Sequence, residues 1–138
     1  MKPLRLGVLG SGRGSNFVAL AESIGRGGVP GEIVLVGSDL AEAPILDLAR
    51  ERKLPVHVCR PGAFRTKLEA EIEEDLVRAL VSAGVELVVL AGYMRVVKEP
   101  LLRKFPGRIL NIHPSLLPSF PGLKAWEQAL REIGRAHV

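Results

Sequence analysis

Short apolar runs of strand length alternate with amphipathic stretches along this 138-residue chain, and this alternation limits the possible folds most strongly. Several of the runs are nearly continuous in Leu, Val and Ile, and together they span residues 4–9, 32–37, 55–59, 86–91 and 108–112. Such runs are typical of strands buried on both faces, and intervening helices are the usual connection between parallel strands. The sequence therefore predicts an α/β fold, with a doubly wound, mainly parallel sheet and helices on both faces.

Helical periodicity predicts a helix between most of these strands, over residues 17–24, 44–53, 65–83, 98–105 and 125–132. Ser15 or Asn16 is expected to cap the first helix, and Gly84 to end the third. The third helix is expected to keep its acidic residues outside, namely Glu69, Glu71, Glu73 and Glu74. Since the chain contains neither a repeat nor a linker, we expect a single domain.

Charge and cysteine content exclude several classes of protein. Lys and Arg outnumber Asp and Glu by 19 to 15, but they are dispersed, which argues against nucleic-acid binding. No apolar run approaches the roughly 20 residues of a membrane span. The single cysteine, Cys59, cannot form an internal disulfide, and it follows an apolar run. We therefore expect a buried thiol in a cytoplasmic protein without membrane contact.

A glycine-rich loop, G-S-G-R-G-S-N over residues 10–16, joins the first strand to the first helix. Such a loop brings backbone N–H groups close to an anion, and the helix N-terminus adds partial positive charge. We expect Gly14, Ser15 and Asn16 to bind a phosphate group. One alternative is a tight turn without a ligand, and another is a dinucleotide site in which Asp39 would bind a ribose. The dinucleotide spacing is broken, because Ser15 stands where the third glycine belongs.

The segment N-I-H-P-S-L-L-P-S-F-P-G, over residues 111–122, follows the fifth strand and carries the residues best suited to chemistry. Asn111 and His113 are two positions apart, so they project to the same side of extended backbone. His113 can transfer a proton near neutral pH, and the Asn111 amide can donate to an oxyanion. A purely structural histidine is the alternative. Neither His57 nor His113 has ligands at metal-binding spacing, so no metal is expected.

Three motifs together resemble the phosphoribosylglycinamide formyltransferases: G-S-G-R-G-S-N, A-G-Y-M-R-V and N-I-H-P-S-L-L-P-S-F-P-G. The resemblance implies transfer of a formyl group from 10-formyltetrahydrofolate to the amine of glycinamide ribonucleotide, in purine biosynthesis and without a metal. These two small molecules would be the partners of the protein. A phosphoribosyl- or nucleotide-binding module without catalysis is the first alternative, and an NAD-dependent enzyme is the second.

The resemblance also implies roles for individual residues. Gly14, Ser15 and Asn16 would bind the substrate phosphate. Asn111 would stabilise the oxyanion, and His113 would be the proton donor. The folate site would be lined, largely through backbone, by Met94, Arg95, Val96 and Val97, and Lys67 would contact the formyl-folate. Lys67 stands where the family has an arginine, so it keeps the charge but loses the planar fork.

The end of the chain departs from this resemblance, which stops after Leu130. The family has an Asp paired with the catalytic His, and it lies beyond this chain together with further strands. We therefore expect residues 1–131 to form an incomplete domain with little or no formyl transfer, and residues 132–138 to be a non-native tail. The Leu117–Pro118 peptide bond is expected to be cis, because X-Pro bonds tolerate this isomer.

Overall fold

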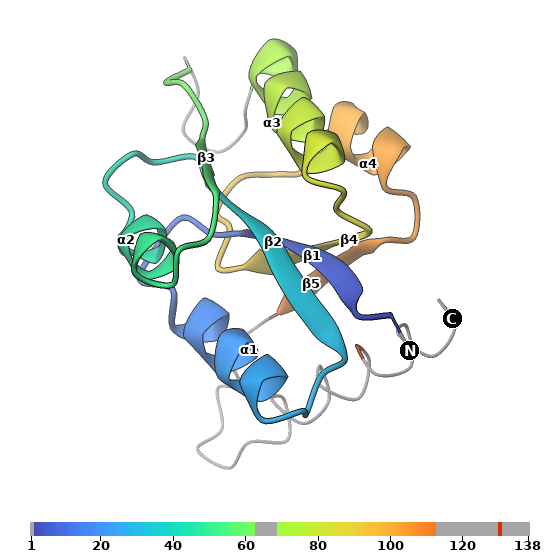
Figure 1. Cartoon of the computed structure of the whole chain (residues 1–138). Helices are drawn as coiled ribbons and strands as arrows, with labels where there is room; N and C mark the ends of the chain where they lie inside the picture. Colours follow the sequence, from blue (N-terminus) through green and yellow to red (C-terminus); the bar gives the residue numbers. More distant parts are fainter. Residues whose placement is uncertain (1, 63–68, 113–129, 131–138) are drawn as a thin grey trace.

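Five parallel strands form the centre of the computed structural model, which describes residues 2–62, 69–112 and 130 (Figure 1). The sheet order is β3-β2-β1-β4-β5, and every neighbouring pair in it is parallel. The strands are β1 (Leu4–Leu9), β2 (Gly31–Ser38), β3 (Val56–Val58), β4 (Leu87–Ala91) and β5 (Ile109–Ile112). The predicted parallel α/β sheet is confirmed, and β1 has the predicted bounds.

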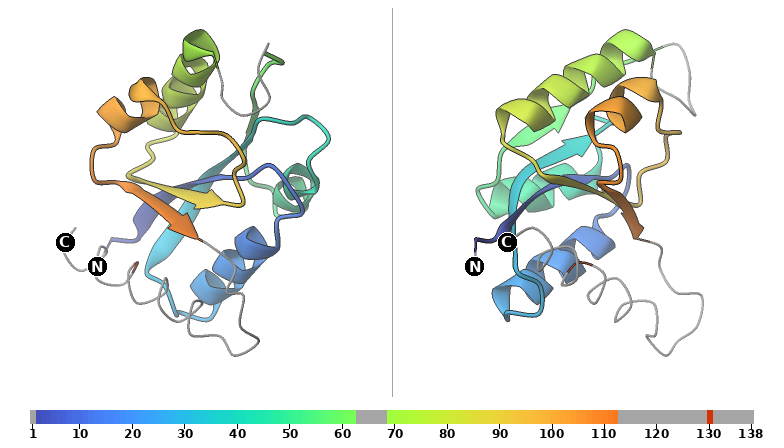
Figure 2. Two further views of the ribbon diagram at one scale, coloured as in Figure 1. Left: turned by 180° about the vertical axis from the view of Figure 1, so that it is seen from behind. Right: turned by 90° about the vertical axis from the view of Figure 1, so that its right-hand side faces the viewer.

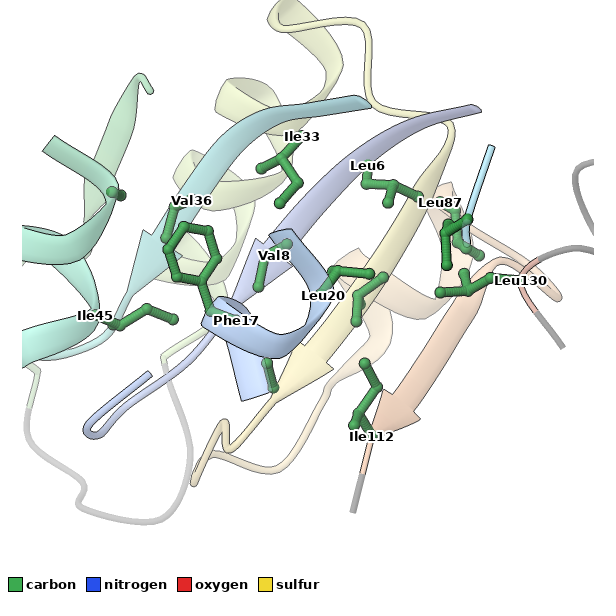
Figure 3. Close-up of a cluster of buried hydrophobic side chains, with 14 of the residues drawn as sticks. Leu6, Val8, Phe17, Leu20, Ile33, Val36, Ile45, Leu87, Ile112 and Leu130 are labelled. Carbon is green, nitrogen blue, oxygen red and sulfur yellow. The ribbon is translucent and has the colours of Figure 1, made fainter. Parts of the chain in front are cut away.

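Helices cover both faces of this sheet (Figure 2). One face is covered by α1 (Ser15–Gly25) and α2 (Pro44–Glu51), and the other by α3 (Ala70–Ser82) and α4 (Glu99–Lys104). In the first core, Phe17 of α1 packs with Val8 of β1 (Figure 3). In the second core, Leu80 of α3 packs with Leu9 of β1. The sheet is therefore doubly wound, which explains why its strands are apolar on both faces.

Gly7 in the middle of β1 shows how closely α3 approaches the sheet. A Cβ atom at this position would lie 2.7 Å from Leu80 Cδ2 and 2.9 Å from Val85 Cγ2. Any larger residue would force these two buried side chains to shift. The second core therefore depends on a missing side chain at the centre of the sheet.

Helix starts differ from the predicted ones in two places. The N-cap of α1 is Gly14, with φ of 84°, so the prediction that Ser15 or Asn16 caps this helix is wrong. The reason is that the chain enters α1 in a left-handed conformation, which glycine adopts without strain. Glu69, with ψ of 150°, is the extended N-cap of α3, so this helix begins later than predicted. Gly84 follows its end with φ of 77°, as expected of a helix-ending glycine.

Glu73 is buried, with only 2% of its surface exposed, so its predicted exposure is wrong. The cause is the packing of α4 against α3. The backbone N–H of Lys98, the N-cap of α4, donates a hydrogen bond to Glu73 Oε1 at 2.9 Å. Glu73 Oε2 has no hydrogen-bond partner. Burial raises the pKa of this carboxyl, and the bond from Lys98 opposes the shift.

Leu130 is helical and fully buried in the first core, and it belongs to the stretch predicted as a helix over 125–132 (Figure 3). The rest of that predicted helix, the Leu117–Pro118 bond and the predicted tail over 132–138 lie outside the described residues. Among residues 2–62 and 69–112, no helix has the length and apolar character needed to cross a membrane.

Candidate functional site

The carboxyl ends of β1 and β4 mark the place where the strand order reverses. From β1 the chain builds outward through β2 and β3, and it then returns to add β4 and β5 on the other side of β1. In open α/β sheets, ligands bind at such a switch point, just beyond the carboxyl ends of the strands. The loop over residues 10–16 follows β1, and the segment over residues 92–97 follows β4. Both predicted ligand segments therefore lie at the switch point.

Packing accounts for two of the three glycines in the loop over residues 10–16. A Cβ atom at Gly10 would lie 2.6 Å from Ile45 Cδ1 and 2.8 Å from the carbonyl oxygen of Ala91. Gly14 has φ of 84° and also lies against Ile45. A Cβ atom at Gly12, in contrast, would meet nothing within 4 Å. Turn geometry and close packing thus explain Gly10 and Gly14, whereas open space lies beside Gly12.

The N-terminus of α1 has the properties of an anion site. Its N-cap, Gly14, has no side chain, and its first turn contains no acidic residue. The first intrahelical bond runs from Val18 N–H to the Gly14 carbonyl at 2.9 Å, so the preceding N–H groups have no intrahelical acceptor. Ser15 is exposed and Asn16 is half-buried. An anion placed here would find backbone donors, two polar side chains and the positive end of the helix dipole.

A buried hydrogen-bond network joins the loop after β1 to the ends of β2 and β4. The Ser11 hydroxyl donates to Asp39 Oδ1 at 2.6 Å and accepts from the Met94 backbone N–H at 2.8 Å. Arg95 Nε donates to Asp39 Oδ2 at 2.6 Å. The Asp39 and Arg95 side chains are only 3% and 10% exposed. We refer to Ser11, Asp39 and Arg95 as the strand-end network.

This network does not favour the dinucleotide alternative for the loop. In that alternative, Asp39 would accept hydrogen bonds from the hydroxyl groups of a ribose. Each of its carboxylate oxygens instead accepts a short hydrogen bond from within the protein. A carboxylate that is buried and bonded on both oxygens is poorly placed to receive a ligand hydroxyl. Sequence reasoning weighed Asp39 only as a ribose ligand in that alternative, and it gave no sign of the bonds to Ser11 and Arg95.

The segment after β4 exposes apolar side chains at the same edge of the sheet. Met94 and Val96 are 73% and 59% exposed, which is unusual for large hydrophobic residues. The residues between and after them are more buried, since Arg95 bonds to Asp39 and Val97 packs against the second core. The segment therefore presents apolar surface outward while its other residues anchor it to the protein.

Asn111 lies near the end of β5, where it pairs with Leu90 of β4 and is exposed. It therefore lies at the same edge of the sheet as the segment over residues 92–97, on the neighbouring strand. His113 and Lys67 lie outside the described residues. The structure thus brings together the loop over residues 10–16, the segment after β4 and Asn111, and it leaves the predicted proton donor and the predicted lysine contact untested.

A cavity of about 520 Å³ opens beside the strand-end network, at the ends of β2 and β3. Its lining includes Asp39, Cys59 and Arg95. Burial, aided by the negative charge of Asp39, raises the pKa of the Cys59 thiol to about 11. Cys59 is therefore a neutral buried thiol, as predicted. In the part of the chain that the structure describes, no three His, Cys, Asp or Glu side chains are placed to hold a metal ion together.

Known proteins resemble this chain in both sequence and fold. The sequence model of the formyl transferase family matches residues 4–137. The phosphoribosylglycinamide formyltransferase of Bacillus subtilis (strain 168) is 36% identical over 127 residues, which are 92% of this chain and 64% of that protein. The trifunctional purine biosynthetic protein adenosine-3 of Drosophila pseudoobscura pseudoobscura is 44% identical over 128 residues, which are 91% of this chain and 9% of that protein.

The crystal structure of glycinamide ribonucleotide transformylase 1 from Symbiobacterium toebii superposes with a TM-score of 0.74 at 44% identity. The superposition covers 95% of this chain and 61% of that one. This chain therefore spans less than two thirds of the length of these three relatives. Their names are those of enzymes, which does not favour a binding module without catalysis.

Proposed function

Since this chain belongs to the formyl transferase family, we propose that it carries the ribonucleotide site and part of the folate site of a phosphoribosylglycinamide formyltransferase. The reaction would move a formyl group from 10-formyltetrahydrofolate to the amine of glycinamide ribonucleotide. One observation carries the proposal: the N-terminus of α1, with no acidic residue in its first turn, and the exposed apolar segment after β4 lie together at the switch point of the sheet.

The ribonucleotide phosphate would bind at Gly14, Ser15 and Asn16. The absence of an acidic residue in the first turn of α1 supports this assignment, because a carboxylate there would compete with the phosphate. The open space beside Gly12 supports it as well, since a ligand can approach the loop there. The glycinamide amine at the other end of the substrate would then extend toward β4 and β5.

Formyl-folate would bind along Met94, Arg95, Val96 and Val97. The exposed side chains of Met94 and Val96 offer apolar contacts to its ring system, and the backbone offers hydrogen bonds. Lys67 would contribute a positive charge toward the folate carboxylates. The buried thiol of Cys59 suits a reducing compartment, so we assign this reaction to the cytoplasm.

The chemistry is direct acyl transfer. The amine nitrogen attacks the formyl carbon, a new C–N bond forms, and the carbonyl oxygen becomes an oxyanion that accepts a hydrogen bond from the Asn111 amide. The ammonium proton would pass from the attacking nitrogen to His113, and the tetrahedral intermediate breaks its bond to N10 of the folate. His113 would carry the proton delivered to N10, so tetrahydrofolate leaves neutral at that nitrogen. The protein itself forms no covalent bond.

Calorimetric titration of the 138-residue chain with glycinamide ribonucleotide, tetrahydrofolate and NAD tests the proposal. We expect the ribonucleotide and tetrahydrofolate to bind and NAD to give no heat of binding. Binding of NAD without binding of the ribonucleotide would contradict the proposal and favour the dinucleotide alternative. Tetrahydrofolate separates the two remaining functions, because a simple phosphoribosyl-binding module has no need of a folate site.

A further inference from the structure

We propose that Asp39 is a positioning residue for formyl transfer, because its carboxylate holds the Met94–Val97 segment in place through Ser11 and Arg95. The inference rests on the proposed function, which assigns this segment to formyl-folate. No ligand contact is assigned to Asp39 itself. It lies at the end of β2 and acts across β1 on residues that follow β4.

The hydroxyl of Ser11 connects Asp39 to the backbone of Met94. A serine hydroxyl has one proton to donate and two lone pairs to accept with. Because Ser11 donates its proton to Asp39 Oδ1 at 2.6 Å, its lone pairs are directed to other donors. One of them accepts the Met94 N–H at 2.8 Å. Without Asp39 the hydroxyl could rotate, and the bond from Met94 would lose its fixed acceptor.

The second oxygen of Asp39 holds the next residue of the segment. Arg95 Nε donates to Oδ2 at 2.6 Å, in a charge-assisted hydrogen bond that is almost entirely buried. One carboxylate therefore holds two consecutive residues: the Met94 backbone indirectly, through the Ser11 hydroxyl, and the Arg95 side chain directly. A further bond, from Ser11 N–H to the Gly92 carbonyl at 3.0 Å, joins the same two segments.

Met94 and Val96 need such an anchor because their own side chains point into solvent. They are the most exposed large hydrophobic residues among those described, so they gain little from packing. Their positions therefore depend on backbone bonds: Met94 donates to Ser11, and Val96 forms a β-bridge. A ligand that binds to this segment would find it already ordered, which reduces the entropic cost of binding. Asp39 thereby acts on folate affinity without touching the folate.

The surface pair of Asp47 and Arg50 offers a matched control. These side chains lie 3.4 Å apart on α2, and both are exposed, so solvent screens their interaction. The variants Asp39→Asn and Asp47→Asn remove the same charge by the same isosteric change. The two carboxylates differ in their surroundings: that of Asp39 is buried and joins residues after β1 and β4, whereas that of Asp47 is exposed and pairs with Arg50 of its own helix. Only Asp39→Asn should disturb the segment after β4.

The experiment measures two quantities in the 138-residue chain: affinities for tetrahydrofolate and glycinamide ribonucleotide, and hydrogen exchange at the Met94 amide. In Asp39→Asn and Ser11→Ala we expect faster exchange at Met94 and folate affinity lower by about tenfold, the loss expected of one hydrogen bond. In Asp39→Asn the ribonucleotide affinity should stay unchanged. The double variant should lose less than the product of the two single losses, because both act through the same bond.

One result would contradict the folate assignment, and a different result would contradict the positioning role alone. If the unmodified chain does not bind tetrahydrofolate, the folate assignment fails, and the positioning role fails with it. If the unmodified chain binds tetrahydrofolate and both variants bind it equally well, the positioning role fails while the proposed function stands. Ser11→Ala removes no charge, so it decides the question even if Asp39→Asn does not fold. A purely structural role predicts lower stability with unchanged folate affinity.

Discussion

Replacing Ser15 by Asp should affect ligand binding and folding in opposite directions. Ser15 is the first residue of α1 and is exposed, and the first turn of this helix contains no acidic residue. A carboxylate in the first turn interacts favourably with the helix dipole, which stabilises a protein by about 0.3–1 kcal/mol. The same carboxylate repels a phosphate dianion bound at this helix N-terminus. The substitution therefore separates binding from stability.

The loss of affinity follows from Coulomb's law. One added charge about 5 Å from a phosphate dianion costs roughly 2 kcal/mol at the dielectric constant of water, and more when solvent is partly excluded. A loss of about 2 kcal/mol in binding free energy corresponds to a roughly 30-fold larger dissociation constant. Loss of the Ser15 hydroxyl as a donor adds about 0.5–1.5 kcal/mol. We expect the affinity for glycinamide ribonucleotide to fall by about 30-fold or more.

Calorimetry measures the affinity, and urea unfolding measures the stability of the same preparations. Ser82→Asp is the control, because Ser82 is an exposed residue at the far end of α3 and the change in charge is identical. The control should bind the ribonucleotide as the unmodified chain does. A loss of less than about threefold in Ser15→Asp, or an equal loss in both variants, would refute a phosphate site at the start of α1.

Three further predictions concern the cores. Burial raises the pKa of Glu73 above its ordinary 4.5, so the folded state binds this proton more tightly, and the free energy of unfolding should fall as pH rises from 4.5 through the raised pKa. Urea unfolding midpoints measured across this pH range should show the fall, and Glu73→Gln should abolish it. Gly7→Ala should lower the free energy of unfolding by about 1–3 kcal/mol, because the new Cβ atom overpacks against Leu80. Gly12→Ala is the control and should leave the urea unfolding midpoint unchanged, because a Cβ atom there meets nothing within 4 Å. Cys59 should react with iodoacetamide at pH 8 only after unfolding, since it is buried and its thiol has a pKa of about 11; rapid labelling of the folded chain would contradict this.

The strands could be predicted from sequence because their signal is local. Burial on both faces demands continuous apolar residues, and the run over residues 87–91 has that composition throughout, with every residue buried. Glu73 could not be placed in the same way. Its position on α3 indicates a solvated acid, and only the packing of α4, which begins after Lys98, buries its carboxylate beside a backbone donor. Tertiary contacts override the amphipathic pattern at such positions.

The candidate site was predictable in its segments but not in its connections. Gly14 and Met94 belong to motifs that sequence alone singles out, and the structure places both at the switch point of the sheet. The strand-end network joins residues that are 28 and 56 positions apart, so it depends on the order of the strands. The sequence signals for it are a serine between loop glycines and an Asp directly after a strand. Neither signal indicates its partner.

A titration of the isotopically labelled 138-residue chain, followed by NMR at each backbone amide, tests the central claim most directly. The claim is that two ligands bind side by side at the carboxyl ends of β1 and β4. Glycinamide ribonucleotide should shift the amides of Gly14, Ser15 and Asn16, and tetrahydrofolate should shift those of residues 94–97. Shifts confined to another surface, such as the cavity between α3 and α4 that Glu74 and Arg103 line, would contradict the account.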